Sequence, residues 1–176
     1  TNQIGLDLVN DVIPGAMGGN IQGVVLGTGD SWYEEAFRSY ENQYKGSFCA
    51  YIAYDENVAH NIYSGCDALL VPSRFEPCGL TQLIAMRYGA IPIVRETGGL
   101  RDTVWPYNMF DNTGNGFTFD RYESGLLYDT INRAKTCYFE NRASWDDMVI
   151  RDMNKDVSWE TSARQYKDMY VELTPR

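Results

Sequence analysis

The sequence is poor in basic residues and contains no long apolar run. Only 15 lysines and arginines stand against 24 aspartates and glutamates, so the formal net charge is −9. Binding to a nucleic-acid backbone depends on cations that neutralise phosphates, and this composition therefore argues against a nucleic-acid partner. It does not exclude a small phosphorylated ligand, which two or three arginines can hold. No apolar run approaches the roughly 20 residues of a membrane-spanning helix, and we expect neither a membrane partner nor a signal peptide.

The spacings that are typical of metal sites are also missing. Cys49, Cys66, Cys78 and Cys137 form no C-x-x-C pair, and the single histidine, His60, has no partner at a regular spacing. We therefore expect no metal site, and reduced thiols of the kind found in cytosolic proteins. His60 falls on a predicted helix, where we expect it to serve as a capping or core residue.

What the sequence does contain is typical of one globular domain, residues 1–176, of α/β class. Short apolar runs predict strands at residues 21–26, 48–53, 67–71, 90–94 and 116–119. Helical patterns with glycine at the joints alternate with these runs, which favours βαβ units and a parallel sheet. Residues 105–116 are rich in Asn, Asp and Gly and are predicted to form a surface loop. The tail after the last strand is expected to be entirely helical.

Several helix ends are predicted from capping residues. Ser31 is the expected N-cap of a helix that reaches about Tyr44, with Glu34 completing a capping box, and Asp55 is the expected cap of the next helix. Ser158 is expected to cap a last helix whose buried side carries Trp159, Ala163, Tyr166 and Tyr170.

The first helix is predicted from three apolar residues at helical spacing, Leu6, Val9 and Ile13, and is expected to end at residues 14–19. No strand precedes this helix to begin a sheet. We therefore expect the chain to be a fragment of a longer protein.

The clearest candidate site is residues 72–83, between a predicted strand and a predicted helix. Glu76 precedes Pro77 and is therefore pushed toward an extended conformation at the carboxyl end of the strand. Gly79 allows the chain to turn, and the free N–H groups of residues 79–82 then open a helix, where an anion is favoured. The alternative is an ordinary strand-to-helix loop with a solvated glutamate.

A second loop, at Gly98 and Gly99, is predicted to approach this region closely; the alternative is a plain turn. Arg74, Arg95 and Arg101 are the basic residues near the two loops. We expect them to act as ion-pair partners rather than ligand contacts.

Residues 73–83, Ser-Arg-Phe-Glu-Pro-Cys-Gly-Leu-Thr-Gln-Leu, resemble the bacterial glycogen synthase and plant starch synthase family. Further matches lie at residues 5–8, 26–30, 88–89, 97–104, 116–117 and 158–159. The resemblance spans nearly the whole chain and covers the C-terminal half of such an enzyme. It implies the nucleotide-sugar-binding, Rossmann-like domain of a retaining glucosyltransferase with the two-domain GT-B architecture, followed by a helical tail.

Position by position, the resemblance also implies a site. Glu76 matches the first residue of the family's E-x-x-G-L-T signature, which lies against the donor glucose and can stabilise an oxocarbenium-like transition state. The residues implied to line the sugar and the diphosphate with their backbones are Cys78, Gly79, Leu80 and Thr81. Tyr54 matches an aromatic residue that packs on adenine; without the family it would be read as ordinary half-buried packing.

One position departs from the family. Where this chain has Ile4, the family usually carries a lysine that neutralises the leaving diphosphate. Loss of such a contact costs on the order of 10²–10³ in rate. The resemblance thus leaves the effect of Ile4 on activity open.

The implied function is donor binding in an α-1,4-glucan synthase. It would bind ADP-glucose and release ADP, with the glucan acceptor held through an N-terminal domain outside this chain. No metal and no cofactor beyond the donor substrate are implied, and the location would be cytoplasmic, or plastidial in a plant or alga. Alternatives are a related GT-B enzyme that uses UDP-glucose or another donor, and a catalytically weakened nucleotide- or glucan-binding module. The fragment alone is expected to have little or no activity.

Overall fold

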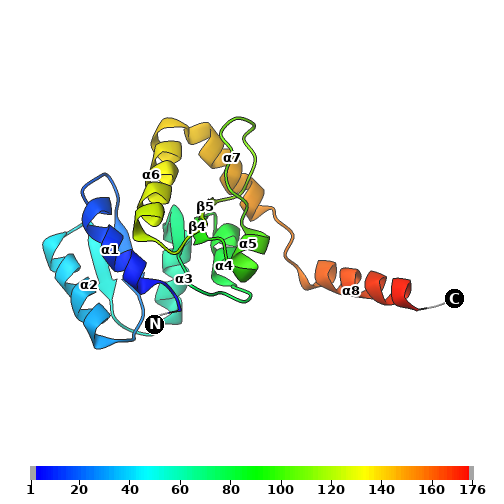
Figure 1. Ribbon diagram of the computed structural model, residues 1–176, viewed down its shortest axis with the longest axis horizontal. Coiled ribbons are helices and arrows are strands. Elements are labelled where there is room, and N and C mark those ends of the chain that lie inside the picture. Colours follow the sequence, from blue (N-terminus) through cyan, green and yellow to red (C-terminus); the bar gives the residue numbers. More distant parts are fainter. Residues whose placement is uncertain (1–2, 175–176) are drawn as a thin grey trace.

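The computed structural model describes residues 3–174 and shows an α/β body from which one helix projects (Figure 1). The elements follow in the order α1 (Leu6–Ala16), β1 (Gly23–Leu26), α2 (Ser31–Gln43), β2 (Phe48–Tyr51), α3 (Glu56–Gly65), β3 (Ala68–Val71), α4 (Thr81–Tyr88), β4 (Ile91–Arg95), α5 (Gly98–Thr103), β5 (Phe117–Phe119), α6 (Ser124–Glu140), α7 (Arg142–Met153) and α8 (Trp159–Leu173). The predicted alternation of strands and helices is confirmed.

All strand pairs are parallel, as predicted. β1 pairs with β2, placing Val25 opposite Ala50, and a second sheet has the order β3-β4-β5, with Leu70 opposite Ile93. Within residues 3–174 the strands form two separate sheets, because no strand pairing joins β1 to β3.

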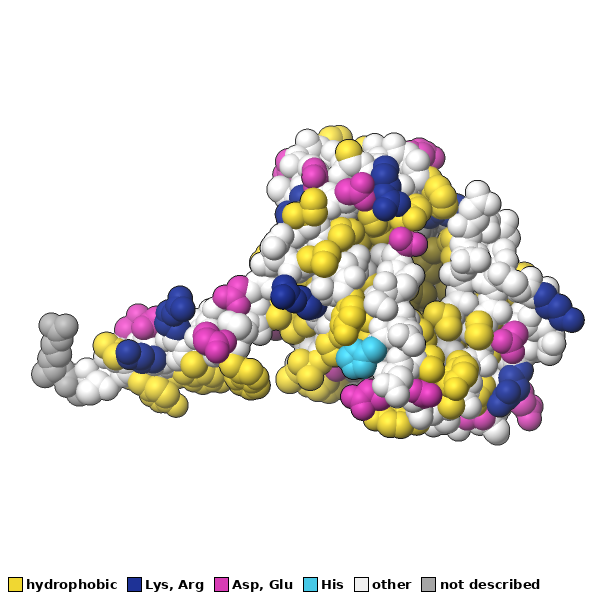
Figure 2. All heavy atoms as spheres, turned by 180° about the vertical axis from the view of Figure 1, so that it is seen from behind, with side chains coloured by type: hydrophobic (Ala, Val, Ile, Leu, Met, Phe, Trp, Pro, Cys, Tyr) yellow, Lys and Arg dark blue, Asp and Glu magenta, His cyan; other side chains and the backbone are white. Residues whose placement is uncertain are grey.

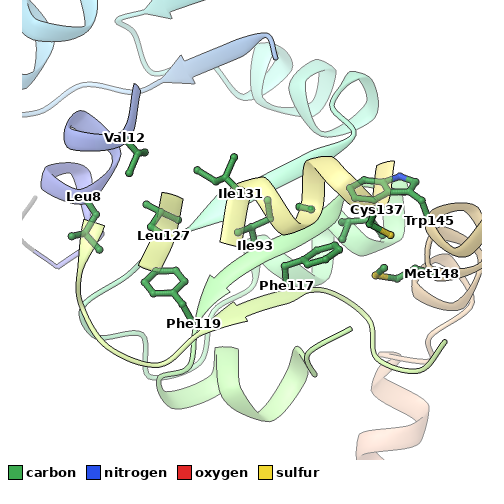
Figure 3. Close-up of a cluster of buried hydrophobic side chains, with 12 residues drawn as sticks. Leu8, Val12, Ile93, Phe117, Phe119, Leu127, Ile131, Cys137, Trp145 and Met148 are labelled. Carbon is green, nitrogen blue, oxygen red and sulfur yellow. The ribbon is translucent and has the colours of Figure 1, made fainter. Parts of the chain in front are cut away.

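The main core lies on one face of the three-stranded sheet, where α1, α6 and α7 cover it (Figure 3). Phe117 and Phe119 of β5 and Ile93 of β4 meet this helical layer. The helices contribute Leu8, Val12, Leu127, Ile131, Ala134, Cys137, Trp145 and Met148. α7 was not predicted as a separate helix, since the only buried apolar residues along it are Trp145 and Met148.

The opposite face of the same sheet packs against α4 and α5. Its buried residues are Val71, Met86, Val94, Leu100 and Val104. Helices on both faces of a parallel sheet are the Rossmann-like arrangement that was expected. A smaller cluster of Ile13, Phe37, Phe48 and Ala50 joins α1 and α2 to β2.

The structure moves the predicted N-cap of α2 by one residue. Asp30, not Ser31, is the N-cap of α2, because its Oδ1 accepts the Trp32 N–H at 2.9 Å. Glu34 still reaches back, but to the amide of Gly29, at 2.9 Å. Aspartate caps a helix as well as serine does, so the capping pattern starts one residue earlier than predicted.

Pro14 lies inside α1 and does not end it. Proline cannot donate to the carbonyl four residues earlier. That carbonyl belongs to Asn10, and it accepts the hydroxyl of Tyr40 at 3.2 Å instead. The helix therefore continues to Ala16.

The other caps are confirmed, while the packing predicted for the last helix is wrong. Asp55 accepts the Val58 N–H at 3.0 Å, and Ser158 Oγ accepts the Thr161 N–H at 3.3 Å. α8 projects from the body, as Figure 1 shows, and the four residues expected on its buried side, Trp159, Ala163, Tyr166 and Tyr170, are exposed. Helical spacing predicts which residues share a face, but it does not say what covers that face.

Candidate functional site

Glu76 lies in the loop between β3 and α4. The strands β3 and β4 are parallel, so the loops that follow them meet at one edge of the sheet, where open α/β sheets bind their ligands. The Glu76 side chain is half-buried, and Ser73 Oγ lies 3.5 Å from its Oε2. A carboxylate therefore stands at the carboxyl edge of the sheet, as predicted.

Gly98 and Gly99 pack directly against the backbone of this loop. The Gly99 N–H donates to the Glu76 carbonyl at 3.1 Å, and a Cβ placed on Gly98 would lie 2.0 Å from the same oxygen. The predicted close approach is confirmed, and a plain turn is excluded. The two glycines also begin α5, which the sequence did not indicate.

The N-terminus of α4 is open toward the same edge. Leu80 occupies the N-cap position, and within residues 3–174 no side chain caps the helix. Cys78, Leu80 and Thr81 are exposed, and Gly79 has a φ of 68°, which permits the turn into the helix. The free amides of the first turn and the positive end of the helix dipole are suited to binding an anion.

Gln82 holds the two loops together, and sequence reasoning missed it. Its side chain is fully buried, and its Nε2 donates to the Gly79 carbonyl at 2.9 Å and to Thr103 Oγ1 at 3.1 Å. Thr103 Oγ1 in turn donates to the Gly99 carbonyl at 2.6 Å. The signal available in the sequence was a glutamine on the otherwise apolar face of the helix after Leu80.

The three arginines behave differently from one another. Arg74 forms the expected ion pair, at 3.8 Å from Asp7, and lies 4.3 Å from the centre of the Tyr122 ring. Arg95 instead donates from Nε to the Ser73 carbonyl at 2.8 Å, which ties the end of β4 to the Glu76 loop. The ion-pair prediction is wrong for Arg95 and for the exposed Arg101, since the described part of the chain gives neither a carboxylate partner.

The residues before α1 also belong to this edge. The Arg74 N–H donates to the Gln3 carbonyl at 2.8 Å, and a Cβ on Gly5 would lie 2.2 Å from the Pro72 carbonyl oxygen. Ile4 lines the same cavity as Glu76, with 49% of its surface exposed. The structure therefore brings the residue that departs from the family pattern next to the candidate site.

Tyr54 follows the carboxyl end of β2 and is 92% exposed. The reading of Tyr54 as half-buried packing is therefore wrong. Its exposed ring is available to a planar ligand.

His60 lies on α3, as predicted, yet it is neither a cap nor a core residue. It is exposed, and its Nδ1 lies 3.0 Å from the Tyr88 hydroxyl. Residues 3–174 contain no cluster of three or more His, Cys, Asp or Glu that could hold a metal ion. None of the helices described there is long and apolar enough to cross a membrane. Burial raises the pKa of the Cys66 and Cys137 thiols, whereas Cys78 is exposed beside Glu76.

A parallel sheet covered by helices on both faces defines a Rossmann-like domain, and the carboxylate and the uncapped helix lie at the edge where such domains bind ligands. Comparison with known proteins identifies the family. Residues 3–149 match the family described as "Glycosyl transferases group 1", and the chain belongs to that family.

Individual relatives agree with the family. The chain is 47% identical over 173 residues to the glycogen synthase of Lachnospira eligens, a match that covers 98% of this chain and 36% of that protein. It also superposes on the catalytic domain of starch synthase IV from Arabidopsis thaliana, bound to ADP and acarbose, with a TM-score of 0.85 and 36% identity over 98% of this chain and 36% of that one. The resemblance read from residues 73–83 and the GT-B fold class are confirmed. The chain spans about a third of the length of these relatives.

Proposed function

We propose that this chain is the donor-binding, C-terminal GT-B domain of a retaining glucosyltransferase. The enzyme transfers glucose from ADP-glucose to an α-1,4-glucan, as a glycogen or starch synthase does. The observation that carries the proposal is the Glu76 carboxylate beside the uncapped N-terminus of α4, with Gly98 and Gly99 packed on its backbone. The similar glycogen synthase and the starch synthase bound to ADP and acarbose support it.

The chemistry divides between the carboxylate and the helix. The bond between the sugar C1 and the diphosphate oxygen breaks, and ADP leaves. A hydroxyl of the glucan forms the new bond on the same face and passes its proton to the released diphosphate oxygen. Glu76 accepts hydrogen bonds from the sugar hydroxyls and stabilises the positive charge that develops on the ring. The amides of Leu80 and Thr81 receive the diphosphate, and Cys78 and Gly79 line the sugar with their backbones.

Two exposed residues would meet the rest of the nucleotide. Tyr54, at 92% exposure, offers its ring to the adenine. Ile4 lies at the mouth of the site, where the family usually places a lysine, and supplies no charge to the leaving group. The site therefore relies on backbone dipoles for the diphosphate more than its relatives do.

The acceptor is held by an N-terminal domain outside this chain. The exposed face of α8, with Trp159 at 87% and Tyr170 at 62% exposure, would pack against that domain. Residues 1–176 alone should therefore have little or no activity. We further propose a cytoplasmic location, or a plastid one if the source is a plant or alga.

Ile4 also favours a second candidate, a nucleotide- or glucan-binding module that has lost most of its activity, and the use of UDP-glucose or another donor is the alternative within the enzyme class. Titration calorimetry of the full-length protein with ADP-glucose and with UDP-glucose, followed by a glucan elongation assay, separates the three. The proposal expects tighter binding of ADP-glucose and elongation of glycogen. Preference for UDP-glucose would overturn the donor assignment, and binding without elongation would favour the module.

A further inference from the structure

The backbone of the Glu76 loop is held to the rest of the protein by its carbonyl oxygens. The carbonyls that accept a hydrogen bond from a side chain or from the start of α5 are those of Ser73, Arg74, Glu76 and Gly79. A buried backbone carbonyl is costly to leave unpaired, so these bonds restrict where the loop can lie. The loop is thus fixed at several points along its length and not only where it joins β3 and α4.

One side chain, that of Arg95, makes two of these bonds and a third beside them. Arg95 is the last residue of β4 and is half-buried. Its Nε donates to the Ser73 carbonyl at 2.8 Å, its Nη1 to the Asp120 carbonyl at 3.3 Å, and its Nη2 to the Arg74 carbonyl. Ser73 and Arg74 follow β3, and Asp120 follows β5. A single guanidinium therefore joins the carboxyl ends of β3, β4 and β5.

This arrangement requires the shape of arginine as well as its charge. The guanidinium is planar and presents its N–H groups in fixed directions from three nitrogens, and all three nitrogens of Arg95 are used. A lysine at the same position would carry the charge on one nitrogen at the end of a flexible stem. It could not hold three carbonyls in the same geometry.

The charge of Arg95 is committed to these carbonyls. Figure 2 shows Lys and Arg side chains scattered among Asp and Glu over one face of the molecule. Arg95 differs from such surface cations, because it forms no ion pair with a carboxylate in residues 3–174. Hydrogen bonds from an ionised donor are roughly twice as strong as neutral ones. The three bonds are therefore a firm attachment for the loop.

Tyr122 supports the guanidinium from a further element. The Arg95 guanidinium lies 5.8 Å from the centre of the Tyr122 ring, over which Arg74 also lies, at 4.3 Å. The Tyr122 hydroxyl donates to Asp7 of α1, which fixes the ring. Arg95 is thus itself held in place by packing and not free to change its rotamer at no cost.

The bonds of Arg95 lie immediately before Glu76 in the chain. Ser73, whose carbonyl Arg95 holds, is 2% exposed, and its Oγ is 3.5 Å from Glu76 Oε2. On the other side, the Gly99 N–H holds the carbonyl of Glu76 itself. The backbone that carries the carboxylate is therefore fixed from two directions, by Arg95 before it and by α5 beside it.

We propose that Arg95 is a positioning residue for glucosyl transfer, which holds the backbone of Ser73 and Arg74 so that the Glu76 carboxylate lies against the donor sugar. The inference rests on the proposed function, since it assigns a support to the carboxylate that acts there. Arg95 itself contacts carbonyls and not the donor. A displacement of about 1 Å at a reacting group can cost about 10²-fold in rate. The α4 amides and Tyr54 would still hold the nucleotide, so we expect a loss in kcat without a matching rise in KM.

Steady-state kinetics of the full-length protein test this separation. Arg95→Ala should lower kcat about 30- to 100-fold and change KM for ADP-glucose by less than about threefold. Arg95→Lys keeps the charge but not the three bonds, and should lower kcat about tenfold or more. Arg101→Ala is the matched control, because Arg101 lies in α5, is exposed and forms no ion pair in residues 3–174. It should keep kcat within about twofold.

The kinetics also distinguish positioning from two other roles. The value of kcat is divided by the concentration of sites that bind ADP, measured by calorimetry, so that unfolded protein is not counted. Normal kcat per ADP-binding site in Arg95→Ala would show that Arg95 only stabilises the fold, and would overturn the proposal. Full activity in Arg95→Lys would show that only the charge is needed, and would overturn it too.

NMR of isotopically labelled glutamate carboxyl groups in the full-length protein gives a readout that does not depend on transfer. The Glu76 signal is the one missing from Glu76→Gln. It should move in Arg95→Lys and stay in place in Arg101→Ala. An unmoved Glu76 signal in Arg95→Lys would overturn the positioning role. If the unchanged protein transferred no glucose but the signal moved as expected, the proposed function would fail while the support of Glu76 by Arg95 would stand.

Discussion

The backbone of Gly99 touches the backbone of Cys78. A Cβ on Gly99 would lie 1.9 Å from the Cys78 carbonyl oxygen and 2.8 Å from its Cα, so no other residue fits without moving one loop. The start of α5 thus fixes the position of the loop that carries Glu76. The position of the carboxylate depends on a residue that bears no functional group.

Gly99→Ala should therefore damage both stability and turnover. The added methyl must push the Cys78 loop away from α5, and we expect a loss of roughly 1–3 kcal/mol in unfolding free energy and of at least about tenfold in kcat. Gly125→Ala is the matched control, because nothing lies within 4 Å of a Cβ at Gly125 in α6. It should leave kcat unchanged and stabilise the protein by about 0.5–1 kcal/mol. Equal behaviour of the two variants in urea unfolding and steady-state kinetics would refute the steric argument.

Tyr54 should contribute to donor binding and not to stability. Its ring is 92% exposed, so Tyr54→Ala removes little packing from the free protein. We expect KM for ADP-glucose to rise about three- to tenfold, with kcat and Tm nearly unchanged, in line with about 0.5–1.5 kcal/mol for an aromatic stack. Tyr54→Phe keeps the ring and should retain most of the affinity. If Tyr54→Ala binds ADP-glucose as tightly as the unchanged protein, Tyr54 does not contact the nucleotide.

Ile4→Lys should raise the rate of transfer. Ile4 is 49% exposed and lines the cavity beside Glu76, so a lysine there can reach the diphosphate without being buried. A cation that neutralises the leaving group can contribute up to about 10²-fold in kcat. Ile4→Met changes the shape without the charge and serves as the control. Should Ile4→Lys and Ile4→Met give the same kcat, the missing charge at this position has no consequence.

Asp152 should make the stability of the domain depend on pH. It lies on α7, only 2% of its surface is exposed, and neither carboxylate oxygen has a hydrogen-bond partner in residues 3–174. Burial raises its pKa from 3.8 to about 7, although the nearby Lys155 and Arg151 oppose the shift. The folded state thus keeps a proton that the unfolded state loses, and stability falls as pH rises from about 4 to about 7.

Asp152→Asn mimics the protonated form and should remove this dependence. Relative to the unchanged protein, the variant should gain about 2 kcal/mol of unfolding free energy between pH 5 and pH 8. Urea denaturation at the two pH values measures the gain. Asp129→Asn, which removes an exposed carboxylate of α6, is the control and should show no comparable gain. A gain at Asp152 that is the same at both pH values would mean that the carboxyl does not titrate as described.

The parts of the fold with strong local signals could be predicted from the sequence. Strands such as Ile91–Arg95 and caps such as Asp55 follow from short-range patterns, and both appear where expected. The burial expected for Trp159 and Tyr170 was wrong, because a helical stripe does not identify its partner. The division into two sheets was not predicted for a related reason: strand pairing depends on which strands lie beside each other.

The sequence indicated the residues of the candidate site but not the contacts that hold them in place. Glu76 and the two glycines, Gly98 and Gly99, were identified, because an acid before proline and a glycine pair have local signatures. The roles of Gln82 and Arg95 were not, since Gln82 donates to the hydroxyl of Thr103 and Arg95 to the carbonyl of Ser73, and both partners are distant in the sequence. Such contacts leave no spacing pattern in a single sequence.

The proposed function depends on Glu76, and one measurement tests the role of this residue directly. The transfer of labelled glucose from ADP-glucose to glycogen can be followed for the full-length protein and for its Glu76→Gln and Glu140→Gln variants. Glu140 is an exposed carboxylate at the C-terminal end of α6, and its variant should keep normal turnover. We predict that Glu76→Gln lowers kcat by about 10²–10³ while the protein stays folded and still binds ADP. Normal turnover in Glu76→Gln would show that this carboxylate does not act on the donor sugar.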